Sequence, residues 1–381
     1  MKRFGGLVMV AVLLVTWLPY RVQAVDLDIQ AKSALLIEAS TGTVLYEKNA
    51  HEALAPASVT KVMTMLLVME AIDSGKIGWE DTVTASEAAA AKGGSQIYLK
   101  VGETMSVRDM VKSIAVSSAN DCACAMAEHI AGSEAAFVDL MNSRAKELGM
   151  NDTTFVNCTG LDDDADAASH KTSAYDIALM SAQLLNNHPD IKEFTTIWMD
   201  SVRDGTFGLS NTNKLVRFYS GATGLKTGFT QAAGYCLSAS AQRDGMELIA
   251  VVMGCESSQT RFAACKAMLD YGFANFAVVS PQLEGDTAVP VKLGVADTVR
   301  AIPAQQTPLL IDKAQKNTVN IRLELENEVT APVSQGQRLG TMYVTAGEQV
   351  LTQIPMVAET AVSKLSWGQM FRRVLKSICL G

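Results

Sequence analysis

The sequence predicts an α/β domain followed by a separate all-β module, and three observations lead to this fold class. Two strand-like runs, at residues 33–38 and 43–47, enclose the turn Ser40-Thr41-Gly42 and predict a hairpin. Helical patterns then dominate as far as residue 186. Short runs separated by turn residues follow between 214 and 253 and predict successive antiparallel strands, and alternating strands fill the chain after Phe276.

The length, composition and charge of the chain limit the class of protein. At 381 residues it is long enough for two domains or more, and its 48% hydrophobic and 19% charged residues are typical of a globular protein. The formal net charge is -8, and it becomes -11 (29 basic against 40 acidic residues) once residues 1–24 are removed. This acidic balance argues against a nucleic-acid partner.

The N-terminus has the pattern of an export signal. Lys2 and Arg3 precede an apolar stretch at residues 7–18, and Val22-Gln23-Ala24 supplies the small residues that signal peptidase needs. We therefore expect a signal peptide at 1–24, a mature chain that begins at Val25, and a protein that works outside the cytoplasmic membrane. An uncleaved membrane anchor is the alternative interpretation of the same residues.

The cysteines do not suggest a metal site. Their number is odd and their spacing does not match a zinc motif. In an exported protein some could pair, whereas several lie in apolar segments where a buried thiol is equally expected. The seven positions are 122, 124, 158, 236, 255, 265 and 379.

The first helix after the hairpin carries the strongest candidate for chemistry. Ser58 and Lys61 are three positions apart, so a helix places hydroxyl and amine on one face, and residues 62–71 are apolar on every side. An amine in such surroundings should have a lowered pKa and could accept the proton of the serine. The same spacing at Ser143 and Lys146 lies on the polar face of an amphipathic helix, where we expect both side chains to be solvated.

A second candidate follows an irregular, glycine-rich stretch at residues 73–104. Ser106 and Asp109 have capping-box spacing and predict a helix that runs to Val116. Another helix is predicted from Cys122, so Ser118 and Asn120 are expected in a short loop, where side chains can point into one cleft. The alternative is that this segment only caps the second helix.

The middle of the chain is predicted to be helical at 133–148 and 172–186, with Gly149 closing the first of these helices. The aspartates at 162–166 lack the glycine and the distal glutamate of an EF-hand, so we expect a solvated loop and not a calcium site.

Four strands are predicted next, at 215–218, 221–226, 234–241 and 246–253. Lys226-Thr227-Gly228 is expected to end the second of them. Glycine there allows close approach of a backbone or substrate, and the other two residues offer a cation and a hydroxyl. By itself this triplet is also a common surface turn. A helix is expected at 261–273.

The C-terminal part is predicted to form an all-β domain at 277–358, with strands at 288–293, 318–324 and 338–344, and a final helix at 359–381. The helix aligns Trp367, Phe371, Val374 and Ile378 on one stripe, and it carries basic residues but no acid after Glu359. This pattern favours a helix in the membrane interface over a spanning one. A helix docked on the β domain itself is the alternative.

Together, the three short motifs are more specific than any one of them. In the order Ser58-x-x-Lys61, Ser118-x-Asn120 and Lys226-Thr227-Gly228, the chain resembles the penicillin-binding proteins and serine β-lactamases. Its surroundings, among them residues 41–46 and 224–228, are similar to those of the low-molecular-mass D-alanyl-D-alanine carboxypeptidases. The likeness runs from about residue 33 to 276, and the trailing β domain and amphipathic C-terminus also fit that family.

The resemblance implies a five-stranded antiparallel sheet flanked by helices, with a helical insertion, at residues 25–276. It implies that Ser58 attacks the carbonyl between two D-alanines, that Lys61 takes its proton, and that water clears the acyl-enzyme. β-Lactams would acylate Ser58, and no cofactor or metal is expected. The remaining implied site residues are Ser118 as proton relay, Asn120 for positioning, Lys226, Thr227 and Arg261 for the substrate carboxylate, Gly228, and Phe229, whose amide would complete the oxyanion site.

The sequence leaves two alternative functions open. A β-lactamase of the penicillinase type would need a glutamate ahead of Lys226, and no Glu-x-x-Leu-Asn pattern occurs between Gly149 and Lys226. A non-catalytic β-lactam or muropeptide sensor would be acylated without turnover. Cys158 stands where relatives often carry proline, and this departure affects only the expected shape of the local loop.

Overall fold

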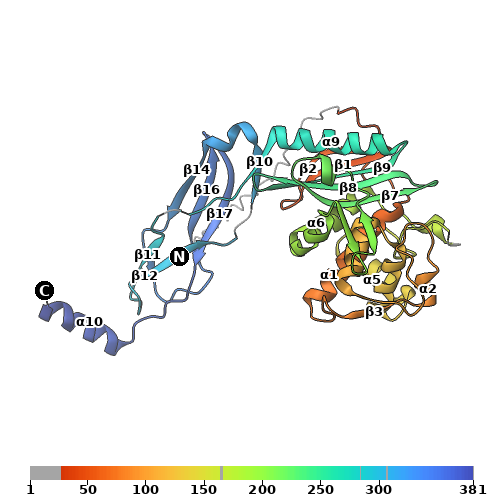
Figure 1. The fold of residues 1–381 in the computed structure, drawn as a ribbon. Helices are drawn as coiled ribbons and strands as arrows, with labels where there is room; N and C mark the ends of the chain where they lie inside the picture. Colours follow the sequence, from red (N-terminus) through yellow and green to blue (C-terminus); the bar gives the residue numbers. More distant parts are fainter. Residues whose placement is uncertain (1–26, 164–165, 284, 306–307, 381) are drawn as a thin grey trace, which may run out of the picture.

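A computed structural model describes residues 27–380 except 164–165, 284 and 306–307. Figure 1 shows two parts, an α/β domain and an elongated all-β part that ends in helix α10 (Trp367–Leu380). The predicted signal peptide at 1–24 lies outside the described residues.

The α/β domain is built on one antiparallel sheet with the strand order β2-β1-β9-β8-β7. The first two strands, β1 (Ser33–Glu38) and β2 (Val44–Lys48), come from the start of the domain. The other three, β7 (Ala222–Thr230), β8 (Gly234–Arg243) and β9 (Met246–Cys255), come from its end. The expected five-stranded sheet from the first two and last three strands is therefore confirmed.

Helices cover both faces of this sheet, as Figure 1 shows. On β1, Leu35 and Ile37 belong to the core shared with the helical region, whereas Ala34 and Leu36 belong to the core under α9 (Ser258–Asn275). This alternation is the period of two that a strand imposes, and burial on both faces explains why β1 is apolar throughout.

The helical region between β2 and β7 begins with a 3-10 turn, η1 (Ala57–Thr60), that leads directly into α1. Helix α1 has apolar residues on every side and is largely buried at the centre of the domain, as predicted. The helices of this region are α1 (Lys61–Asp73), α2 (Glu87–Ala90), α3 (Val107–Ser117), α4 (Asn120–Ala131), α5 (Glu134–Glu147), η2 (Ala167–Ser169), α6 (Ala174–Asn187), η3 (Pro189–Ile191), α7 (Lys192–Thr195) and α8 (Leu215–Phe218).

Several local predictions hold. The Ser106 hydroxyl accepts a hydrogen bond from the Asp109 amide and caps α3. Ser143 and Lys146 are both exposed on α5. The six cysteines whose side chains the structure describes are buried free thiols, which favours the second interpretation of these residues.

Other predictions are wrong in detail. Residues 215–218 form the single helical turn α8 and not a strand, because four residues carry too little pattern to separate the two. The stretch 73–104 is not wholly irregular, since it holds α2 and the strand β3 (Thr82–Thr84), which pairs with β4 (Thr104–Ser106). The hairpin of β5 (Met199–Val202) and β6 (Phe207–Ser210) was not predicted.

The all-β part contains a six-stranded sheet with the order β14-β16-β17-β12-β11-β15 and a pair formed by β10 and β13. Strand β14 alternates between half-buried and exposed residues, as expected for a strand with one solvated face. The elements are β10 (Phe276–Val279), β11 (Ala288–Lys292), β12 (Thr298–Pro303), β13 (Leu309–Asp312), η4 (Lys313–Thr318), β14 (Val319–Leu325), β15 (Val329–Thr330), β16 (Arg338–Ala346) and β17 (Gln349–Ala358). Among the helices that the structure describes, none is long and apolar enough to cross a membrane.

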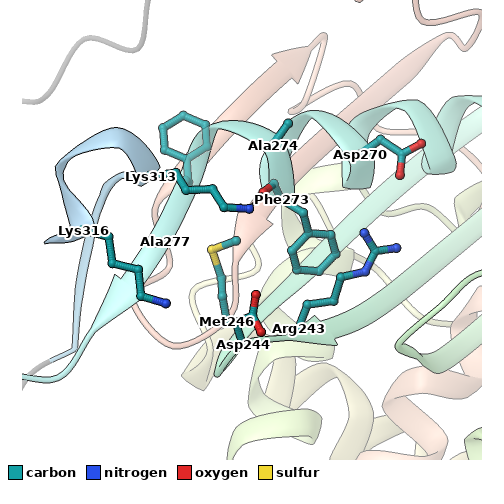
Figure 2. A pocket seen from close by; sticks show the side chains of 10 residues that line it. Arg243, Asp244, Met246, Asp270, Phe273, Ala274, Ala277, Lys313 and Lys316 are labelled. Carbon is teal, nitrogen blue, oxygen red and sulfur yellow. Dashed lines mark hydrogen bonds between the residues drawn. The ribbon is translucent and has the colours of Figure 1, made fainter.

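The two parts meet at the end of α9, where a cavity of about 240 Å³ opens between them (Figure 2). Its lining comes from the β8–β9 turn, α9, β10 and η4. Lys313 of η4 reaches across it and donates a hydrogen bond of 2.7 Å to the Phe273 carbonyl at the end of α9. This contact ties the β part to α9, the helix that covers the sheet face opposite α1.

Candidate active site

Ser58 lies on η1, and Lys61 is the first residue of α1. The Lys61 Nζ atom donates a hydrogen bond of 2.9 Å to the Ser58 Oγ and a second one of 2.7 Å to the carbonyl of Thr159. The two side chains therefore meet as predicted, although the turn that joins them is 3-10 and not α-helical.

Burial sets the protonation of Lys61. Its side chain is fully buried, and loss of hydration lowers the pKa of the amine to about 7, with Cys158 and Asp121 opposing this effect. At neutral pH a large share of Lys61 is consequently uncharged and has a lone pair available to take a proton.

The loop after α5 supplies a partner that the sequence did not reveal. The Asn157 Oδ1 accepts hydrogen bonds from the backbone amides of Thr159 and Gly160, at 3.2 and 2.7 Å. This turn directs the Thr159 carbonyl at Lys61, where it holds one proton of the amine. A backbone carbonyl carries no side-chain signature, so residue types alone could not identify it.

The second motif lies at the junction of α3 and α4. Ser118 adopts a left-handed backbone with a φ of 62° and ends α3. Asn120 is the first residue of α4, so the prediction that it lies in the loop is wrong. The Asn120 Nδ2 donates to the Gly93 carbonyl at 2.7 Å. Its Oδ1 is buried and has no hydrogen-bond partner among the described residues, so this oxygen is available to a donor that enters the site.

The third motif lies inside β7 and does not end it, because the strand continues to Thr230. The Lys226 Nζ is buried and donates to the Thr227 carbonyl at 2.9 Å. Burial lowers the pKa of Lys226, and the charges of Lys61 and Arg261 lower it further. The Thr227 hydroxyl donates to the Thr212 Oγ1 at 2.6 Å.

Gly228 lets this strand approach η1, the turn that carries Ser58. A Cβ atom at Gly228 would lie 2.6 Å from the Pro56 oxygen and 3.1 Å from the Val59 nitrogen. The close approach predicted for this glycine is therefore made to η1, and it places the edge strand β7 beside Ser58. The next residue, Phe229, has a half-exposed ring that packs against the Tyr235 ring, with 4.3 Å between the ring centroids.

Arg261 reaches the same strand from α9. Its guanidinium donates to the carbonyls of Gly228 and Cys236 at 3.0 and 3.4 Å. The Nε atom is buried without a hydrogen-bond partner among the described residues, and burial lowers the pKa of the group. The structure thus places the Lys226-to-Phe229 segment of β7 beside η1 and the adjoining Lys61. Arg261 contacts this segment from α9, through its hydrogen bond to the Gly228 carbonyl.

No group of three potential metal ligands occurs among the residues that the structure describes. Of the predicted aspartate loop, residues 164–165 lie outside the described residues, and the flanking Asp162, Asp163 and Asp166 are exposed.

Comparison with known proteins gives the family. Residues 20–257 match the model of the D-alanyl-D-alanine carboxypeptidase peptidase family, and residues 276–364 match that of the C-terminal domain of penicillin-binding protein 5. The chain belongs to the D-alanyl-D-alanine carboxypeptidase family. This family is the one that the three motifs had suggested.

Curated relatives match this chain over most of their length. The chain is 41% identical over 387 residues to the D-alanyl-D-alanine carboxypeptidase DacF of Bacillus subtilis, with 98% of each chain covered. It is 33% identical to DacC of Escherichia coli, with 91% of this chain and 87% of the relative covered.

Solved structures agree with the fold. Penicillin-binding protein 5 from Haemophilus influenzae superposes with a TM-score of 0.75 at 29% identity, covering 88% of this chain and 98% of that one. Penicillin-binding protein D2 from Listeria monocytogenes, in its ampicillin-bound form, superposes with a TM-score of 0.56 at 33% identity over 64% of this chain and 98% of that one.

Proposed function

We propose that this carboxypeptidase-family chain removes the terminal D-alanine from peptidoglycan pentapeptide stems through an acyl-enzyme on Ser58. The observation that carries the proposal is the 2.9 Å hydrogen bond between the buried Lys61 amine and the Ser58 hydroxyl. A serine becomes a useful nucleophile only beside a group that can take its proton, and an amine with a pKa near 7 is such a group.

Acylation follows from this pair. The uncharged Lys61 amine takes the hydroxyl proton while the Ser58 Oγ bonds to the carbonyl carbon between the two D-alanines. The backbone amides of Ser58 and Phe229 hold the developing oxyanion. When the tetrahedral intermediate collapses, the C–N bond breaks and Ser118 acts as a relay: its hydroxyl gives a proton to the leaving amine and regains the proton that Lys61 took from Ser58. The last D-alanine then departs, and Lys61 is uncharged again. Water then attacks the ester and regenerates Ser58, with no metal or cofactor in either step.

Substrate binding uses the other predicted residues. The terminal carboxylate is an anion that needs cationic and hydroxyl partners, which Lys226, Thr227 and Arg261 provide at or behind β7. The unpartnered Oδ1 of Asn120 accepts a hydrogen bond from the amide of the substrate. β-Lactams mimic the D-Ala-D-Ala end, so they acylate Ser58 and inhibit the enzyme.

The deciding experiment is the intact mass of the protein after penicillin G, for the wild type and for Ser58→Ala, together with D-alanine release from a muramyl pentapeptide. We expect a covalent adduct and D-alanine release for the wild type, and neither for Ser58→Ala. An adduct without D-alanine release would instead identify a sensor. Rapid loss of the adduct with hydrolysed penicillin would identify a β-lactamase.

We also propose that the protein is exported and rests on the outer face of the cytoplasmic membrane through α10. The apolar stripe of this helix does not pack on the β part, since Trp367, Phe371 and Ile378 are 88%, 66% and 72% exposed. Large apolar side chains in a line with basic residues between them suit an anionic membrane interface. Arg373 of α10 ties the helix to the β part through Asp297 and the Gly294 carbonyl.

Sedimentation with vesicles that contain anionic lipid tests this anchor. We expect the full chain to sediment and the triple variant Trp367→Ser, Phe371→Ser, Ile378→Ser to stay in solution. The variant Leu293→Ser, Val295→Ser removes exposed apolar side chains from the β part and is the matched control. Equal sedimentation of all three proteins would contradict the proposal. We further infer the division into a signal peptide at 1–24, a catalytic domain at 25–276, a β domain at 277–358 and a terminal anchor.

A further inference from the structure

The residue before the nucleophile has an unusual backbone. Ala57 precedes Ser58 in η1 and has a φ of 49°, in the left-handed region that side chains other than glycine rarely adopt. A backbone of this kind persists only when its surroundings hold it in place. The contacts of Ala57 therefore bear on the position of the Ser58 hydroxyl.

Two contacts hold the Ala57 carbonyl. The Thr60 hydroxyl donates to the Ala57 oxygen at 2.9 Å. Gly160, in the loop that binds Lys61, packs closely against the same oxygen: a Cβ atom at Gly160 would lie only 1.9 Å from it. The carbonyl is thus fixed from its own turn and from the loop.

His170 orients the Thr60 hydroxyl. The Val156 amide donates a hydrogen bond of 3.2 Å to the His170 Nδ1, so this nitrogen carries no proton. The hydrogen of the neutral ring is then on Nε2, which lies 2.7 Å from the Thr60 Oγ1 and donates to it. The Thr60 hydrogen can only point onward to Ala57. Both side chains are buried, so water does not replace these bonds.

The backbone fixes His170 relative to η1. Leu54 and Thr172 exchange two hydrogen bonds of 2.9 Å between their amides and carbonyls, two residues after His170 and three before Ala57. The His170 ring also meets the Phe155 ring edge on, at 5.7 Å between centroids. The imidazole is therefore held at a set distance from the turn that carries Ser58.

We propose that His170 and Thr60 are positioning residues for the acylation of Ser58. The one-way chain from the Val156 amide through His170 and Thr60 to the Ala57 carbonyl holds Ala57 in its left-handed backbone and thereby aims the Ser58 hydroxyl. Neither residue touches the substrate. The inference rests on the proposed function only in that Ser58 is the group acylated.

The chain offers a matched pair of variants at Thr60. Thr60→Val keeps the shape of the side chain and removes the hydroxyl, whereas Thr60→Ser keeps the hydroxyl. Acylation by penicillin G is followed over a range of concentrations, which separates the dissociation constant of the first complex from the acylation rate constant. Active serines are titrated by intact mass. A merely destabilised protein has fewer active serines at the same rate constant.

We expect Thr60→Val to lower the acylation rate constant per active serine by about ten- to a hundredfold, with the dissociation constant unchanged and Thr60→Ser close to wild type. His170→Leu should act like Thr60→Val, and the double variant should be no slower than either, because both break one chain. Ser181→Ala removes a buried hydroxyl bonded to Ser238 in the same domain and should keep the wild-type rate constant.

The outcomes separate this inference from the proposed function. A wild type that is not acylated on Ser58 overturns the proposed function. An acylated wild type with an unchanged rate constant in Thr60→Val, or an equal loss in Ser181→Ala, overturns the positioning role alone. Should Thr60→Val not fold, His170→Gln against His170→Leu decides, since only glutamine can still donate to Thr60; equal rates for the two would overturn the role.

Discussion

Three cations of the candidate site and two cations of the β part lie in opposite environments. At the site, Lys61, Lys226 and Arg261 are 0%, 1% and 7% exposed, and within the described residues none of them forms an ion pair with a carboxylate. In the β part, Lys292 pairs with Glu328 and Arg322 with Glu324, and all four side chains are about half exposed or more. The cations of the site have thus lost their hydration, whereas those of the β part remain in contact with water.

The difference teaches where chemistry is to be sought. Burying an amine without a counter-charge disfavours the charged form and costs stability, and a protein keeps such a group only where its altered protonation is used. An exposed ion pair contributes little to stability. The contrast supports the proposed role of Lys61 as a base more strongly than its residue type alone.

The largest effect is expected from Lys61→Met. Loss of the proposed general base should lower acylation and D-alanine release by about 10²–10⁴-fold. Because methionine fills the same space without a buried amine, the free energy of unfolding at pH 7 should be unchanged or higher. Enzyme kinetics measure the loss of activity, and thermal unfolding measures the stability.

The matched change in the other region is Lys292→Met. Its side chain is 62% exposed in the ion pair with Glu328, so activity and stability should both stay close to wild type. The contrast between buried and exposed cations fails if Lys61→Met keeps its activity, or if the two variants lose stability alike.

The sequence predicted the parts of the site that side chains carry. Ser58 and Lys61 needed only their spacing and an apolar helix, and the order of the three motifs sufficed for the family. The Thr159 carbonyl and the His170 contact could not be predicted, since one has no side-chain signature and the other joins residues 110 positions apart. The sequence predicts a strand where the structure has the four-residue helix α8, because so short a run fits both the helical and the strand period.

A second contrast between the two regions concerns glycines with left-handed backbones. Gly160 of the site has a φ of 80°, and a Cβ atom there would lie 1.9 Å from the Ala57 oxygen. Gly336 of the β part has a φ of 77°, and a Cβ atom there would meet nothing within 4 Å.

We expect Gly336→Ala to lower the free energy of unfolding by about 1–2 kcal/mol, which is the backbone term alone. Gly160→Ala should cost about 3 kcal/mol or more, because η1 or the loop must also move, and acylation should fall with it. Denaturant unfolding and penicillin acylation compare them. Equal losses of stability would show that the loop does not clamp Ala57.

The buried amine also predicts a pH dependence that exposed cations do not. The pKa of Lys61 is lowered to about 7, so the amine gains a proton below that pH and can no longer take one from Ser58. Acylation by penicillin should therefore fall about tenfold for each pH unit below about 7 and level off above it. The free energy of unfolding should also increase with pH. Between about 7 and the ordinary lysine value the unfolded chain binds the extra proton, so Lys61 makes the fold more stable as the pH rises.

Stopped-flow acylation across this range tests the prediction, and the Lys292→Met variant, which leaves the buried amine in place, should give the same curve as the wild type. A rate that is flat through neutrality, or that rises as the pH falls, would remove Lys61 from the role of base.

The smallest effect is expected from Arg322→Ala in the β part. This residue pairs with Glu324 along β14 and lies 4.5 Å over the Tyr343 ring, yet it is 59% exposed. Water and salt screen such a pair, and the ring contact adds only a fraction of a kcal/mol at an exposed site. We expect a loss of about 1 kcal/mol or less in denaturant unfolding and an unchanged acylation rate constant. A larger loss of stability would mean that surface charge also stabilises the β part. A slower acylation would mean that the β part affects the site. Either result would contradict the contrast between the two regions.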